Sequence, residues 1–133
     1  MPKALRAYLT SGLIMLVIDA VWLTVMADPL YRAMIGHLMR PDGFLVAPAV
    51  AFYLLYLVGI LVLAQLPAAD WRGAAWRGAV YGLCAYGTYD LTNQATLRDW
   101  PWTVTLIDLV WGTTLTASVA ALGHRLTWRS PRT

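Results

Sequence analysis

The chain has 133 residues, of which 59% are hydrophobic and 13% charged, and it contains no glutamate. With a mean hydropathy of +0.58, it cannot cover an ordinary soluble surface, which excludes a soluble enzyme and indicates an integral membrane protein. We interpret the net charge of +3 as a topology signal, and no nucleic-acid partner is expected.

Four windows are long enough to cross about 30 Å of hydrocarbon. In chain order they are residues 7–27, 45–66, 75–97 and 102–123. They predict an all-α fold, an integral membrane four-helix bundle that forms one domain over residues 1–133. The first window is too long for a signal-peptide core and lacks a cleavage pattern, so we expect it to be retained. Residues 28–44 are predicted to form an outer amphipathic loop.

The basic residues predict the orientation of the bundle. Seven of the ten are expected on one side: Lys3, Arg6, Arg72, Arg77, Arg125, Arg129 and Arg132. Because basic residues concentrate in cytoplasmic segments, both termini are expected inside, giving an N-in/C-in, multi-pass protein in the lipid bilayer. The same bias favours a bacterial inner membrane.

Three aspartates lie within the apolar windows: Asp19, Asp90 and Asp108. At 1.5 Å per residue, each is expected roughly 9 to 12 Å below the outer boundary. A carboxylate at this depth is usually turned inward and is paired, protonated or bound to a ligand. Three carboxylates so close together cannot all be ionised in an empty site, which favours proton-coupled exchange or cation binding.

The segments around two of these aspartates repeat a motif. Residues 18–24 and 107–113 agree at five of seven positions, and the two helices are expected to run in opposite directions. In each copy a tryptophan, Trp22 or Trp111, follows the aspartate by three residues. The indole and the carboxylate therefore share a helical face and can share a pocket.

The third window is the most polar, and its spacing places Tyr86, Asp90 and Asn93 on one face. Tyr89 is expected to add a wall to the same pocket. The second window has no charged residue, so it is expected to face lipid or a dimer partner.

Small residues predict which helices pack together. Ala74, Gly78 and Gly82 recur every four residues in the third window, and Gly112 and Thr116 continue a matching face from Asp108 in the fourth. Such stripes let helix backbones approach closely. We expect these two helices to pack together, with the first completing the pocket.

The chain also resembles a known family at specific positions. The residues that carry the resemblance are Tyr89, Asp90, Leu91, Thr92, Asn93, Ala95, Thr96, Leu97, Trp100, Pro101, Asp108, Trp111, Gly112 and Thr113, with Phe52 to Tyr56 in the second window. They closely resemble the bacterial membrane family called domain of unknown function 2177. The resemblance implies a compact four-helix membrane protein and brings no assigned activity.

We predict a binding pocket made of Asp19, Trp22, Tyr86, Tyr89, Asp90, Asn93, Asp108 and Trp111. It is predicted to bind or translocate a small cation, a proton or a cationic solute. The three aspartates are candidate ligands for a hard metal ion such as Mg²⁺ or Ca²⁺. No catalytic residue and no cofactor is identified, and a homodimer is left open.

Two other functions stay open. One is a membrane enzyme, or its accessory subunit, that acts on a lipid or isoprenoid with carboxylates as acid and base. The other is a structural or assembly protein whose aspartates join helices through hydrogen bonds. A transporter should have water paths to both sides, a lipid enzyme should have a lateral opening, and an assembly protein should have a filled pocket.

Overall fold

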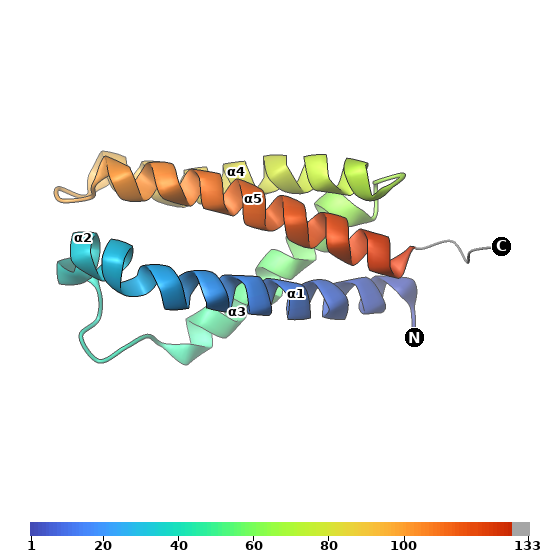
Figure 1. The fold of residues 1–133 in the computed structure, drawn as a ribbon, viewed down its shortest axis with the longest axis horizontal. Helices are drawn as coiled ribbons and strands as arrows, with labels where there is room; N and C mark the ends of the chain where they lie inside the picture. Colours follow the sequence, from blue (N-terminus) through green and yellow to red (C-terminus); the bar gives the residue numbers. More distant parts are fainter. Residues whose placement is uncertain (129–133) are drawn as a thin grey trace.

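The computed structural model describes residues 1–128, and that part of the chain is helical without strands. Its elements are α1 (Lys3–Met26), the π-helical segment η1 (Ala27–Arg32), α2 (Ala33–Ile35), the 3-10 turn η2 (Gly36–Leu38), α3 (Val46–Gly59), the π-helical segment η3 (Ile60–Gln65), α4 (Trp71–Thr96) and α5 (Trp102–Thr127). The start of α1 and the end of α5 lie at the same end of the bundle (Figure 1). The all-α, four-helix prediction is confirmed.

Within residues 1–128, three segments are long and apolar enough to cross a membrane: Lys3–Leu38, Val46–Gln65 and Trp102–Thr127. α4 has 26 residues, which gives it the length of a span, but its polar residues keep it out of this group. It begins four residues before the predicted window, because Asp70 caps it by accepting a hydrogen bond of 2.8 Å from the Gly73 amide. The fourth span stays a prediction.

The predicted outer loop over residues 28–44 is wrong for most of its length. Pro29 has no N–H and its ring crowds the preceding turn, which favours a helix end at this point. Instead the helix widens into the π-helical segment η1 and continues through α2 to Leu38. The irregular connection is therefore short and contains Gly43, whose positive φ of 97° suits glycine.

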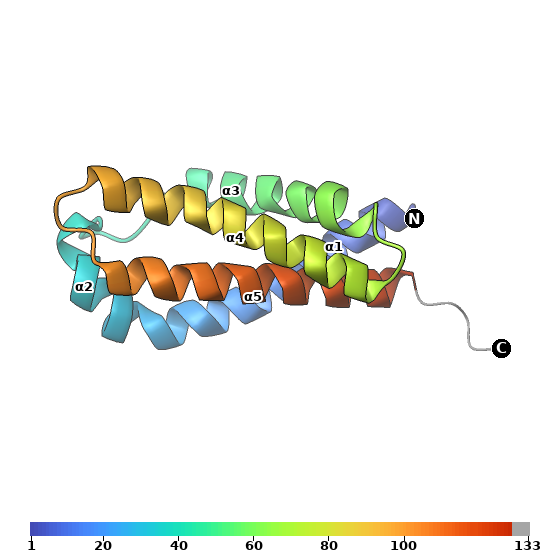
Figure 2. The same ribbon diagram turned by 90° about the horizontal axis from the view of Figure 1, so that it is seen from above.

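α4 and α5 form the closest helix pair, as the small-residue stripes predicted, and Figure 2 shows them side by side. A methyl group added at Gly82 would lie 2.2 Å from the Gly112 carbonyl oxygen. One added at Gly78 would lie 2.7 Å from the Thr116 carbonyl oxygen. The two backbones touch because these side chains are absent.

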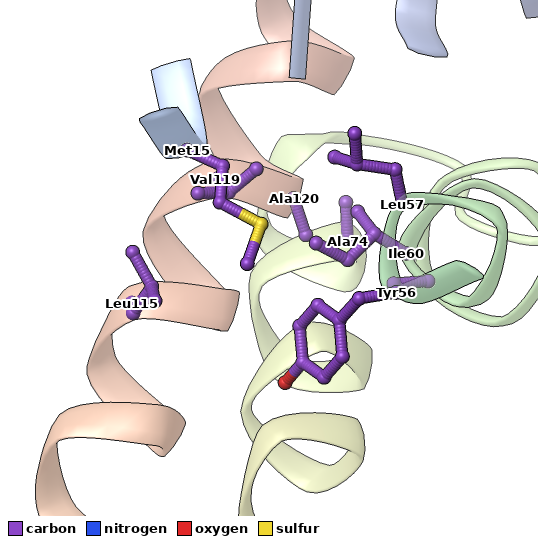
Figure 3. Close-up of a cluster of buried hydrophobic side chains, with 9 residues drawn as sticks. Met15, Tyr56, Leu57, Ile60, Ala74, Leu115, Val119 and Ala120 are labelled. Carbon is purple, nitrogen blue, oxygen red and sulfur yellow. The ribbon is translucent and has the colours of Figure 1, made fainter. Parts of the chain in front are cut away.

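The larger of two clusters of buried hydrophobic side chains lies between α1, α3, η3, α4 and α5 (Figure 3). It consists of Met15, Tyr56, Leu57, Ile60, Ala64, Ala74, Leu115, Val119 and Ala120. Beside it, the buried Gln65 amide donates to the Ser11 hydroxyl at 2.8 Å and to the Ala120 carbonyl at 3.2 Å. The end of α3 and η3 thus belong to the interior.

The first half of α3 behaves differently. Between Val46 and Leu55 no residue is buried, and Figure 1 shows this half of the helix diverging from α4. The prediction that the second window is a lipid-facing or dimer-facing wall is therefore wrong for the tyrosines and for Ile60, Ala64 and Gln65, which turn into the bundle, whereas Val62 and Leu63 stay exposed. The divergence leaves space beside the predicted site.

Candidate functional site

A cavity of about 450 Å³ lies between the first half of α3 and the other helices. Its walls are mainly aromatic, with two carboxyl groups among them. The lining residues are Asp19, Trp22, Leu23, Tyr31, Phe52, Tyr56, Ala85, Tyr86, Tyr89, Asp108 and Trp111. Six of the eight predicted pocket residues are in this set; Asp90 and Asn93 are not.

Asp19 projects from α1 and is 6% exposed. It accepts a short hydrogen bond from the Tyr53 hydroxyl of α3 and a longer one, 3.4 Å, from the Trp111 indole nitrogen of α5. Asp19 therefore connects three helices.

Asp108 of α5 is 5% exposed and has a different set of partners. The Tyr31 hydroxyl donates to its carboxylate at 2.6 Å and accepts from the Trp22 indole nitrogen at 3.1 Å. Tyr31 lies in η1, so this contact exists only because the first helix continues past Pro29.

The two copies of the repeated motif meet at their tryptophans. The Trp22 and Trp111 rings stack with centroids 4.2 Å apart and an interplanar angle of 7°. Each indole N–H points towards the carboxylate of the opposite copy: Trp111 bonds Asp19 directly, and Trp22 reaches Asp108 through Tyr31. The predicted antiparallel arrangement is confirmed, although each indole serves the other copy's aspartate and not its own.

Asp90 of α4 is fully buried, with 0% exposure, and does not line the cavity. Neither of its carboxyl oxygens has a hydrogen-bond partner among residues 1–128. The carboxyl group of Asp108 is its neighbour across the contact with α5. Asn93, on the same face of α4, is half-buried.

The three aspartates do not form the predicted metal site. Within residues 1–128 no group of three or more His, Cys, Asp and Glu side chains could hold a metal ion. Asp19 and Asp108 line the cavity from different helices, whereas Asp90 is fully buried and does not line it. The pocket is better described as an aromatic cavity with two carboxyl groups.

Four aromatic lining or hydrogen-bonding residues were missed from the sequence: Tyr31, Phe52, Tyr53 and Tyr56. Tyr53 and Tyr56 are three residues apart and share one helix face, which could have revealed them. Phe52 is four residues before Tyr56, so the same signal applied to it, whereas Tyr31 lies beyond the predicted end of the first window at residue 27.

The cavity has a mouth on the side of the bundle. Among its lining residues, Leu23 is 45%, Phe52 43% and Tyr89 57% exposed, and they come from α1, α3 and α4. Leu23 and Phe52 lie inside the candidate spans Lys3–Leu38 and Val46–Gln65, and Tyr89 lies within α4. The opening is therefore lateral, the feature predicted for a protein that acts on a lipid.

The bonds to Asp19 and Asp108 join helices, as the structural alternative predicts. The cavity, however, is not filled by side chains, which that alternative also requires.

The sequence was also compared with known proteins. A family model described as a predicted membrane protein, DUF2177, matches residues 4–125. No curated protein and no solved structure matches the chain. Because the match covers nearly the whole chain, the protein belongs to the DUF2177 family of predicted membrane proteins.

Proposed function

We propose that the cavity binds an organic cation that has an apolar body. The observation that carries this proposal is the pairing of two buried carboxyl groups with aromatic walls in one space of about 450 Å³. Aromatic faces attract cations through their quadrupoles, most strongly when water is excluded. A bare metal ion would need more oxygen ligands than Asp19 and Asp108 provide.

The mouth of the cavity favours a ligand that enters from the bilayer. Leu23, Phe52 and Tyr89 are partly exposed on the side of the bundle, where lipid chains would contact them. An amphiphile could leave its apolar part at this mouth and place its charged group near Asp108.

Each part of the site then has a separate task. Asp108 supplies negative charge, with its orientation fixed by Tyr31. The stacked Trp22 and Trp111 supply a rigid aromatic wall. Asp19, held by Tyr53, adds negative charge on the opposite side.

Binding can be tested with hexyltrimethylammonium, a permanently charged amphiphile. The purified protein in detergent is titrated while tryptophan fluorescence is recorded, because two indoles line the cavity. We expect a saturable response, an affinity at least tenfold weaker in Asp108→Asn, and no change in Asp28→Asn. Asp28 is a matched control because it is exposed and paired with Arg32 at 2.5 Å, outside the cavity.

The uncharged isostere, in which carbon replaces the quaternary nitrogen, separates charge recognition from simple partitioning. It should produce no saturable response. Equal responses to the ion and the isostere, or an unchanged affinity in Asp108→Asn, would contradict the proposal.

A membrane enzyme acting on a lipid or isoprenoid is the second candidate, because the lateral mouth is the feature predicted for it. Asp19 and Asp108 would then act as acid and base on either side of the bound group. Conversion of a lipid extract by the wild-type protein, abolished in both Asp19→Asn and Asp108→Asn, would favour this candidate. Stoichiometric binding without a product favours the first.

A further inference from the structure

We propose that Asp90 and Asp108 share one proton in the empty site and release it when a cation binds beside Asp108. This inference rests on the proposed cation site and couples cation binding there to the release of a proton. It makes the site a cation–proton exchanger.

The environment of Asp90 favours its neutral, protonated form. Its side chain is 0% exposed and its two oxygens lack hydrogen-bond partners among residues 1–128. A charged carboxylate without a partner is strongly unfavourable in such a place, whereas a neutral carboxyl group is tolerated far better.

The neighbours of Asp90 supply no positive charge. The titratable groups that face it are Asp108 from α5, Tyr31 from η1 and Tyr89 from its own helix. The ion pairs within residues 1–128 lie elsewhere, at Arg32 with Asp28, His37 with Asp99 and Arg40 with Asp42. Its charge is therefore not balanced by any described basic side chain.

Asp108 explains where the proton is held. Its Oδ1 accepts from the Tyr31 hydroxyl at 2.6 Å, and its side chain also interacts with the Asp90 carboxyl group. Two carboxyl groups that share a site cannot both ionise, and one proton between them removes the repulsion. The empty pair then carries a single negative charge.

Cation binding changes this balance. Asp108 lines the cavity, whereas Asp90 does not, so a positive group reaches the pair through Asp108. With that group in place, both carboxylates can be charged, and the proton leaves to water. One positive charge enters and one leaves, and no covalent bond other than the O–H bond is broken.

Proton release can be counted by calorimetry. Hexyltrimethylammonium has no proton of its own, so its binding heat is measured in two buffers of different ionisation enthalpy at neutral pH. For the wild-type protein we expect about one proton released per bound ion, and an affinity that rises about tenfold per pH unit. In Asp90→Asn we expect binding without release and a flat pH profile, whereas Asp28→Asn should match the wild type.

A second measurement needs no variant. The infrared carbonyl band of a protonated carboxyl group should be present in the empty wild-type protein and disappear when the ion is added. This keeps the proposal testable if Asp90→Asn does not fold, which its thermal unfolding will reveal.

The outcomes separate the two proposals. Binding without proton release, release that persists unchanged in Asp90→Asn, or absence of the infrared band overturns the shared proton and leaves the cation site standing. Failure of the wild-type protein to bind the ion overturns both.

Discussion

Midway along the bundle, α4 and α5 touch at Gly82 and Gly112, and towards the chain termini Ala64 and Gln65 of η3 are buried; at the other end, α3 diverges from α4 and a cavity remains. The terminal half contains most of the large hydrophobic cluster, and within residues 1–128 it has no buried carboxyl group, although Ser11, Gln65 and Thr116 are buried there. The cavity half contains all three buried aspartates and most of the hydrogen-bonded aromatic side chains. The cavity and the buried carboxyl groups thus lie towards one end of the bundle and most of the hydrophobic cluster towards the other, with Tyr56 belonging to both.

The difference has a physical origin. Close backbone contact between α4 and α5, together with the hydrophobic cluster, stabilises the terminal half largely by dispersion. Unfilled space and buried carboxyl groups are each unfavourable for folding. The stability of the terminal half allows the cavity half to contain both. Substitutions in the two halves should therefore affect different measurements.

The largest effect is expected from Gly82→Ala. The added methyl group would lie 2.2 Å from the Gly112 carbonyl oxygen, so the helices must separate. We expect a loss of about 3 kcal/mol or more in unfolding free energy, measured by circular dichroism during denaturation in detergent. Gly87→Ala is the control: its methyl group would lie 3.5 Å from Leu109 and should leave stability equal or higher by up to about 1 kcal/mol. Equal tolerance of both changes would contradict the close contact.

A smaller effect is expected from Gln65→Leu in the same half. The substitution keeps the volume but removes the bonds to Ser11 and Ala120. Interhelical hydrogen bonds of this kind contribute about 0.6 to 2 kcal/mol, so the unfolding free energy should fall by about 1 kcal/mol. Ligand affinity should not change; a change in affinity would show that the halves are coupled.

Tyr53→Phe makes the matching test in the cavity half. It removes one donor to Asp19, which keeps the Trp111 indole as a partner. We expect a loss of about 0.6 kcal/mol in unfolding free energy, by the same denaturation measurement. A loss larger than that of Gln65→Leu would mean that the aspartate serves mainly to join helices.

The smallest effect is expected from Phe52→Leu at the mouth. The ring is 43% exposed, so its loss should leave stability unchanged. A cation–π contact at a partly exposed site contributes about 0.5 to 1 kcal/mol, so hexyltrimethylammonium should bind about two- to fivefold more weakly by fluorescence titration. Leu55→Ala is the control, since Leu55 is on the same helix and does not line the cavity. If Leu55→Ala weakened binding more than Phe52→Leu did, the opening of the cavity would lie elsewhere.

The sequence predicted best what is encoded on single helix faces. The stripes through Gly78 and Gly82, and the motif shared by residues 18–24 and 107–113, depend only on helical spacing and relative direction. Both features were recovered from the sequence for this reason.

Features that depend on tertiary packing were missed. Pro29 locally favours a helix end, but packing of Leu30 and Ile35 against α5 near Val104 lets the helix continue through a π-helical turn. Tyr53 can face lipid or protein equally well, and only the tilt of α3 decides between them. The depth estimate placed the three aspartates together without revealing that Asp90 lies outside the cavity.

The stack of Trp22 and Trp111 has an optical consequence. Two indole rings held 4.2 Å apart and nearly parallel couple their electronic transitions, which adds an exciton contribution to the circular dichroism spectrum. Replacing either ring should remove it, while the other five tryptophans of the chain remain. The protein therefore carries an intrinsic spectroscopic marker of the register between its first and last long helices, which can be followed without any attached label.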